Sequence, residues 1–246
     1  MTHDTAPAPS AVDGPTVPDA TVPDPIVPDM TRPGVGLVAL NRWRADDPAH
    51  QVRLARASLD AWQALRWPAG LLGHHVALGA DGDVVLNYSQ WSDGAALERF
   101  SADGLAERAA WVQERGGEVD RLSSLRLRRY RTMRGPRGDE ATGCLVLVTF
   151  ATQTPGQQVA LVDGIIHNAT TQQPLSPGML ASHFHVSVDG TRVVNVVEFT
   201  SADAHQRVVE GSLPGSPVMH FILAQPGVEA LGFERFEPFG TVAAPV

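Results

Sequence analysis

The sequence predicts an α+β fold in which two tandem ferredoxin-like domains pair as an intramolecular pseudo-dimer. Residues 70–98 and 178–206 align without a gap at a constant spacing of 108, and eight of these 29 positions are identical. Each copy also shows the element order β-α-β-β-α-β, in which an antiparallel sheet carries both helices on one face. The opposite face of each sheet is open. We therefore expect the two sheets to cover one another and to enclose a cavity between them.

The elements of the first copy follow from periodicity and from turn residues. Alternating apolar residues predict strands, and apolar residues at helical spacing after Pro48 predict a helix. Asp93 is a plausible N-cap for the second helix, which Gly104 interrupts. In order, we expect a strand at 35–43, a helix from 48, strands around 74–78 and 84–91, a helix from 93 to about 114, and a strand at 125–131.

The hairpin turn decides which side chains share a face. A two-residue turn at Asp81-Gly82 would set Val76 opposite Asn87, whereas a three-residue turn would set His75 opposite Asn87. We favour the second, which places Val76, Leu78, Val84 and Leu86 against the helices. The cavity side would then hold His75, Asn87, Ser89 and Trp91 from the first copy, and His183, His185, Asn195 and Phe199 from the second.

These elements define the domain boundaries. Residues 1–33 are rich in Pro and contain Val-Pro-Asp three times, so we expect a disordered tail with little apolar surface to bury. The first domain spans 34–131 and is predicted to be catalytic. A linker with Gly and Pro spans 132–141, and a degenerate second domain spans 142–240.

Composition narrows the partners of the chain. The net charge of -8 comes without a basic cluster, which argues against a nucleic-acid partner. No apolar run approaches the roughly 18 residues that span a bilayer, and no secretion signal is visible, so we expect no membrane partner and a cytoplasmic location. The single cysteine, Cys144, cannot form an intrachain disulfide and suits a reducing compartment.

Three residues of the first copy carry the chemical signal. By strand alternation, Asn41 shares a face with Trp43, and Asn87 shares a face with Trp91. An indole offers a flat surface on which an aromatic ring stacks. Amide N–H groups can stabilise an enolate oxygen where negative charge develops. This set predicts a pocket for a planar aromatic ligand that carries oxygen atoms.

The stretch DGDVVLNYSQW, Asp81 to Trp91, together with Asn41, resembles the antibiotic biosynthesis monooxygenase family of the dimeric α/β-barrel superfamily. The resemblance covers roughly residues 35–240. It implies a cofactor-independent monooxygenase that oxidises an anthrone-type or phenolic aromatic polyketide to a quinone with O2, without metal or flavin. It also implies that Asn41, Asn87 and Trp91 form the catalytic set.

The second copy departs from that pattern. Thr149 is aligned with Asn41 and Phe199 with Trp91, so Asn195 alone survives, while His185 matches a histidine position of the family. Leu97 stands near the place of a Tyr that the family often carries, which leaves the base unidentified. We expect one active site, in the first domain. The predicted substrate-binding residues are His75, Ser89, Trp43, His185 and Asn195.

Several alternatives stay open at the level of sequence. His75 could act as a general base. His183 and His185 have metal-ligand spacing, but no third ligand is evident, so no metal is predicted. Cys144 is better explained as a core residue than as a nucleophile. A polyketide cyclase, a haem-degrading oxygenase of the same fold, a non-catalytic ligand-binding protein and a homodimeric assembly all remain compatible with the sequence.

Overall fold

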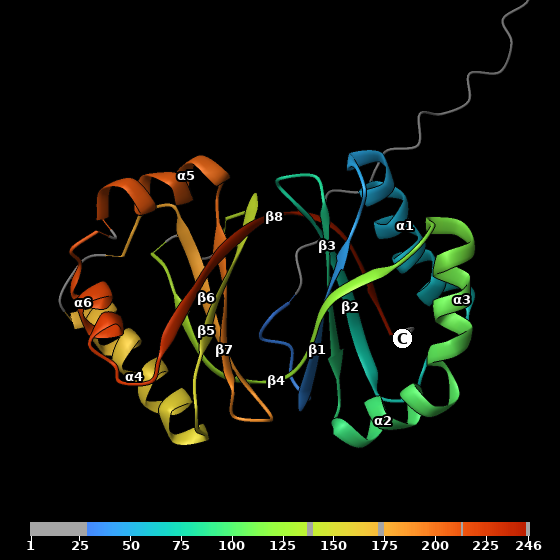
Figure 1. Ribbon diagram of the computed structural model, residues 1–246, viewed down its shortest axis with the longest axis horizontal. Helices are drawn as coiled ribbons and strands as arrows, with labels where there is room; N and C mark the ends of the chain where they lie inside the picture. The colour runs from blue at the N-terminus through green and yellow to red at the C-terminus, as the bar shows by residue number, and fades with distance from the viewer. Residues whose placement is uncertain (1–28, 137–139, 172–174, 213, 245–246) are drawn as a thin grey trace, which may run out of the picture.

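The chain folds into two halves that repeat the same succession of strands and helices (Figure 1). The computed structural model describes residues 29–136, 140–171, 175–212 and 214–244. The first half contains β1 Leu37–Arg44, α1 Pro48–Ala64, β2 Leu71–Gly79, β3 Val84–Trp91, α2 Gly94–Asp103, α3 Leu105–Gly116 and β4 Asp120–Arg134. The second half contains β5 Cys144–Ala151, α4 Pro155–Thr171, β6 Met179–Ser187, β7 Arg192–Phe199, α5 Ala202–Arg207, the π-helical turn η1 Val208–Ser212, α6 Pro217–Leu223 and β8 Glu229–Ala243.

The helices of the first half begin and break where the sequence predicts. Asp47 caps α1 by accepting a hydrogen bond from the His50 amide at 2.7 Å, and Pro48 occupies the first turn, where no amide is needed. Asp93 accepts from the Ala96 amide at 2.8 Å at the start of α2. The chain then breaks at Gly104 before α3. Local capping therefore fixes these boundaries.

The eight strands of the described residues join in one closed barrel, in the order β1-β3-β2-β8-β5-β7-β6-β4. β4 and β8 are 15 residues long, and each pairs with its own half along one part and with the other half along the rest. The predicted linker at 132–141 is therefore wrong at its start, because residues 132–134 of β4 pair with β6. Helices lie outside the barrel on two opposite sides (Figure 1).

The β2–β3 hairpin adopts the register that we did not favour. Val76 lies opposite Asn87 and His75 lies opposite Tyr88. Four residues, 80–83, form the turn, with Gly82 at a φ of +82° and its amide donating to the Gly79 carbonyl at 3.0 Å. As a result, Asn87, Ser89 and Trp91 face the helices. All eight residues of β3 are buried, so its apolar pattern could not tell the two sides apart.

Side chains fill the space between the two sheets, where a ligand cavity was predicted. The interior void beside Tyr88 measures about 10 Å³, which is too small for an aromatic ligand. A barrel of eight strands has an interior just wide enough for its own side chains. The larger buried members of the interior are Leu40, Leu86, Tyr88, Leu127, Leu147 and Phe236.

The last residues of the predicted tail also pack against the barrel. Met30 is 4% exposed and belongs to the interior cluster. Its carbonyl accepts from Arg129 Nη1 at 2.6 Å, and the Asp29 carbonyl accepts from Gln90 Nε2 at 2.8 Å. Residues 29–33 are thus part of the folded structure, contrary to the prediction. Residues 1–28 of that tail lie outside the described residues.

Candidate active site

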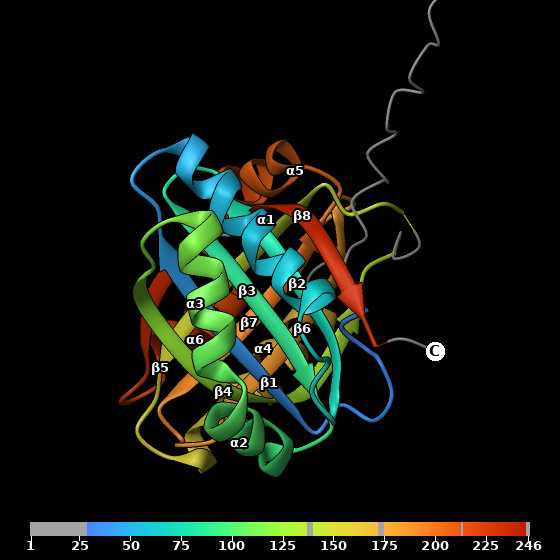
Figure 2. The ribbon, with the colours of Figure 1, turned by 90° about the vertical axis from the view of Figure 1, so that its right-hand side faces the viewer.

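A cavity of about 440 Å³ lies on the outer face of the first half, between the sheet and the helices. Its floor is formed by β1, β2, β3 and β4, and its walls and roof by α1, α2 and α3. Figure 2 shows α1 and α3 lying across these strands, with α2 at one end of them. Ligand sites of this size are usual for small organic molecules.

Five of the predicted site residues line this cavity together. They come from β1 and β3, where Asn41 is the register partner of Asn87. Because side chains alternate along a strand, residues two apart share the cavity side. The five residues are Asn41, Trp43, Asn87, Ser89 and Trp91. The structure therefore brings the predicted catalytic set to one place, although on the opposite side of the sheet from the one expected.

Three predicted substrate-binding residues lie elsewhere. His75 is in the barrel interior, where its Nδ1 is 2.7 Å from Thr241 Oγ1. His185 is also interior and fully buried. Asn195 is in the second half, where its Oδ1 accepts from Ser182 Oγ at 2.8 Å. Both histidines lie between the two sheets, as predicted, whereas the wrong hairpin register put Asn87, Ser89 and Trp91 on the other side, since a slip of one residue exchanges the two faces of a strand.

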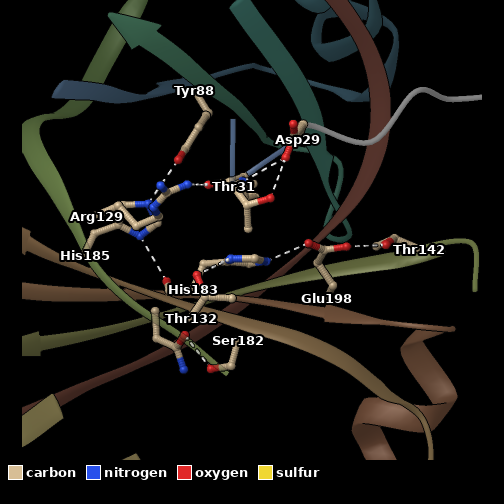
Figure 3. Close-up of polar contacts among 12 residues, drawn as sticks. Asp29, Thr31, Tyr88, Arg129, Thr132, Thr142, Ser182, His183, His185 and Glu198 are labelled. Atoms are coloured by element: carbon tan, nitrogen blue, oxygen red, sulfur yellow. Dashed lines mark hydrogen bonds and ion pairs between the residues drawn. The ribbon is translucent and has the colours of Figure 1, made fainter. Parts of the chain in front are cut away.

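His183 and His185 belong to a buried polar chain in the barrel interior (Figure 3). His185 Nδ1 donates to the His183 carbonyl at 2.9 Å, so its Nε2 accepts the Tyr88 hydroxyl at 3.0 Å. Burial lowers the pKa of His185 to about 3 and raises that of Tyr88. His183 Nε2 is 2.8 Å from Glu198 Oε1. The chain satisfies its polar atoms internally and makes no contact with the cavity.

The second half lacks the equivalent of this cavity wall. Val148 is the register partner of Asn195, just as Asn41 is the partner of Asn87, so the predicted match of Thr149 with Asn41 is wrong by one residue. The error arises because the spacing from β1 to β5 is one residue shorter than the spacing from β2 to β6, so a constant shift of 108 does not match β1 with β5. The second half therefore places an apolar side chain where the first half has an amide.

Trp91 forms a flat apolar surface at the cavity. Its side chain is 1% exposed, and its ring lies 5.3 Å from Phe100 and 6.4 Å from Trp62, between centroids. Its indole Nε1 donates to Ser89 Oγ at 3.0 Å, and Ser89 in turn donates to the Ala39 carbonyl at 3.2 Å. Because the N–H is already paired, Trp91 offers a ring for stacking and no free donor.

Asn87 carries a free donor. Its Oδ1 accepts from Ser58 Oγ at 2.6 Å, whereas its Nδ2 has no hydrogen-bond partner among the described residues. The side chain is 2% exposed. Leaving a buried amide N–H unpaired costs roughly 1–3 kcal/mol, which a ligand oxygen would recover.

Arg108 of α3 was not predicted as a site residue, yet it lines the same cavity as Asn87 and Trp91. Its guanidinium carbon is 3.2 Å from the centroid of the Trp62 ring, and the residue is 7% exposed. Nε and Nη1 have no partner in the described part of the chain. Burial lowers the pKa of Arg108 to about 9, so the group remains a cation at neutral pH. The available signal was an arginine four residues before the buried Val112, on the inward face of α3.

His74 and Ser58 were also missed. His74 lies on the cavity side of β2, and its Nε2 is 3.2 Å from Ser58 Oγ. Burial, followed by the nearby His75 and Arg108, lowers the pKa of His74 well below its usual value. Its Nδ1 has no partner among the described residues. Sequence alone pointed to His75, because the neighbouring imidazole follows from the other hairpin register.

Comparison with known proteins places the fold. No protein-family model matches the sequence. No curated protein matches it either. Among solved structures, an anthrone oxidase-like protein has a TM-score of 0.64 at 17% identity over 85% of this chain and 93% of that one. A candidate monooxygenase from Fusobacterium nucleatum has a TM-score of 0.53 at 10% identity over 84% and 93%.

A third structure, the encapsulated DyP-type peroxidase from Mycobacterium smegmatis, has a TM-score of 0.51 at 9% identity over 87% and 96% of the two chains. At these identities the likeness concerns the fold. At that level it agrees with the resemblance that the sequence suggested.

The described residues contain neither a metal-binding cluster nor a membrane-spanning helix. Within residues 29–136, 140–171, 175–212 and 214–244, no three His, Cys, Asp or Glu side chains gather in a way that could hold a metal ion. In the same part of the chain no helix has the length and apolar character needed to cross a bilayer.

Proposed function

We propose that the protein is a cofactor-independent monooxygenase that uses O2 to oxidise an anthrone-type or phenolic aromatic polyketide to a quinone, as a step of secondary-metabolite biosynthesis. The supporting observation is the pairing of two unsatisfied donors, Asn87 Nδ2 and Arg108 Nε, with the ring of Trp91 around one cavity. A planar ligand that develops negative charge on oxygen would satisfy all three.

The chemistry starts from the acidity of the substrate. A methylene carbon between two aryl rings, which conjugate it with the carbonyl on the far side of the central ring, loses a proton to a base, and the electron pair passes into an enolate. The enolate transfers one electron to O2, and the resulting radical and superoxide combine to form a C–O bond. Protonation gives a hydroperoxide. Loss of the second C–H proton and cleavage of the O–O bond then release water and leave a carbonyl.

The protein contributes donors, shape and a dry setting. Asn87 Nδ2 and the Arg108 guanidinium stabilise the enolate oxygen, and such donors act more strongly where water is excluded. Asn41, the register partner of Asn87, adds a second amide to the same wall. Trp91 holds the ring plane. No bound metal or flavin is required in this scheme, because the carbanion itself reduces O2.

The two halves are further proposed to be tandem ferredoxin-like copies, with one copy specialised for catalysis. The sheet of each half runs in the same relative order, β4-β1-β3-β2 and β8-β5-β7-β6. The aligned positions Asn87 and Asn195 occupy corresponding places in the β3 and β7 strands. Both observations support duplication of one unit followed by loss of the site in the second.

An oxygen electrode with a simple anthrone, in chelator-treated buffer without flavin, tests the proposal. We expect consumption of one O2 per quinone formed. Replacing Arg108 with Gln should lower kcat/KM about 100-fold, in line with the loss of one donor to a developing oxyanion. Arg115→Gln is the matched control, because Arg115 is on the same helix and stacks on Trp111 at the surface. Product formation without O2 uptake would instead indicate a cyclase.

A further inference from the structure

The hydroxyl group of Ser58 links two strands of the cavity floor, β2 and β3. Ser58 projects from α1 and is 3% exposed. Its Oγ is 2.6 Å from Asn87 Oδ1 and 3.2 Å from His74 Nε2. A side chain from the helix therefore contacts polar groups of both β2 and β3 at the point where the ligand would lie.

The hydrogen atoms in this contact can be assigned by counting. Asn87 Oδ1 only accepts, so the single hydroxyl hydrogen of Ser58 is donated to it. The oxygen of Ser58 then presents lone pairs to His74 Nε2, which must carry the hydrogen of that second bond. A neutral imidazole has one N–H. His74 Nδ1 therefore bears a lone pair, and it is the same nitrogen that lacks a partner among the described residues.

The surroundings of His74 keep the imidazole neutral. The titratable or charged groups that act on it are His75 on β2 and Arg108 on α3, and neither favours a second positive charge. Burial opposes the cationic form more strongly still and holds the pKa of His74 well below its usual value. At neutral pH the lone pair of Nδ1 is therefore available to accept a proton.

We propose that His74 is the general base of this site and that Ser58 is a positioning residue, which fixes both the tautomer of His74 and the orientation of the Asn87 amide. The inference rests on the proposed function. The C–H bond of the substrate breaks, an N–H bond forms at Nδ1, and the electron pair enters the enolate held by Asn87 and Arg108. The imidazolium returns this proton to the peroxide after O2 has reacted.

In the second half the corresponding amide, that of Asn195, is held by a serine, and no histidine lies at the position of His74. Ser182 takes the position of His74, since it pairs with Val197 as His74 pairs with Ser89. It donates directly to Asn195 Oδ1 at 2.8 Å. A serine thus orients the strand asparagine in both halves, but an acceptor for a carbon-bound proton is present at this position only in the first.

Nitrogen-15 NMR of histidine-labelled protein tests the assignment without any substrate. The His74 signal, identified by its loss in His74→Gln, should show Nε2–H and a pyridine-like Nδ1, with no protonation down to pH 6. In Ser58→Ala the tautomer should become mixed, while Ser58→Thr, which keeps the hydroxyl, should restore it. An Nδ1–H tautomer, or titration near the ordinary value of 6.5, would overturn the proposal.

Deuterium uptake from D2O into the activated carbon of an anthrone, measured without O2, tests the proton transfer itself. We expect the enzymatic exchange rate to fall by 10²–10⁴-fold in His74→Gln, the range typical of a lost general base. Ser58→Ala should lose about tenfold, a smaller part of the same effect. Ser182→Ala is the matched control and should exchange at the wild-type rate.

The outcomes separate this inference from the proposed function. Exchange without later O2 consumption would leave the base assignment standing and remove the oxygenase. O2 consumption that persists at the wild-type rate in a folded His74→Gln variant would remove the base and leave the oxygenase. A wild-type protein that shows neither reaction would overturn both.

Discussion

The two halves of the barrel have the same strand order and differ in how their helices pack on the sheet. In the first half, α1 and α3 leave a cavity of about 440 Å³ over the strands. In the second, α6 precedes β8 as α3 precedes β4, and it packs closely on α4. A Cβ atom added to Gly164 would lie 2.0 Å from Phe221 Cζ, so the Phe221 ring occupies the surface of α4 that a larger residue would need. One half is thus hollow and the other filled.

The polar residues differ in the same direction. The first half places Ser58, His74 and Arg108 at its cavity, with several donors unpaired. In the corresponding layer of the second half Ser182 and Asn195 bond one another, and Ile165, Phe184 and Ile222 form an apolar core. The comparison indicates that the barrel interior supplies stability to both halves, whereas the layer between sheet and helices is free to become either core or site. Function follows from that layer, and the fold alone does not specify it.

Replacing each of the two strand asparagines with alanine should give the largest difference in activity between the two halves. Asn87→Ala removes the free amide donor of the cavity and should lower kcat for anthrone oxidation roughly 10²–10³-fold. Asn195→Ala, at the matching position, should leave kcat unchanged, because that side chain contacts Ser182 in the filled half. Equal losses in both variants would show that the halves are not specialised as described.

Truncation of the Phe221 ring, which packs on α4 in the second half, should give the next largest effect. Phe221→Ala should lower the free energy of unfolding by about 2–3 kcal/mol, below the roughly 3–5 typical of fully buried rings because Phe221 is half-buried. Urea denaturation measures it. Leu223→Ala on the same helix is the control, since Leu223 is 74% exposed and should change stability by about 0.5 kcal/mol or less. A negligible change in Phe221→Ala would mean that α6 does not fill this half.

Much of the architecture could be predicted from local signals. The caps at Asp47 and Asp93, the break at Gly104 and the alternation that gathers Asn87, Ser89 and Trp91 all depend on residues close in sequence. The side of the sheet could not be predicted, because every residue of β3 is buried and the side then depends on the register that the hairpin turn sets.

The remaining site residues depend on tertiary packing. His74 was replaced by His75 through a one-residue difference in turn length, which sequence does not resolve. Ser58 and Arg108 are on helices, and their relevance appears only once α1 and α3 are laid over the strands. The closure of the barrel through the long strands β4 and β8 is likewise a long-range property.

Acid stability should report on the histidines that the barrel interior, which both halves share, holds neutral. Burial lowers the pKa of His75 to about 4 and that of His185 to about 3, from 6.5 in the unfolded chain. The unfolded state therefore binds these protons first as the pH falls, and stability present above pH 6.5 is lost between about 6.5 and 4. Each histidine contributes a slope of about 1.4 kcal/mol per pH unit in that window.

Urea unfolding at several pH values measures this slope. His185→Gln should make it shallower by the contribution of one histidine, whereas a variant of the exposed His220 should leave it unchanged. A slope that is the same in wild type and His185→Gln would show that His185 is not held neutral in the interior.

The smallest effect is expected from a substitution that converts one residue of the first half into its counterpart in the second. Trp91→Phe introduces the residue found at Phe199, keeps an aromatic ring beside Phe100 and Trp62, and removes the N–H that pairs with Ser89. The change reduces the stacking surface while leaving the donors Asn87 and Arg108 in place. Because aromatic pairs contribute about 0.5–1.5 kcal/mol, we expect KM to rise about 3- to 10-fold with kcat little changed. A loss in kcat as large as that of Asn87→Ala would instead assign Trp91 a direct part in the oxygen chemistry, and the two halves would then differ by two reacting groups at the strand.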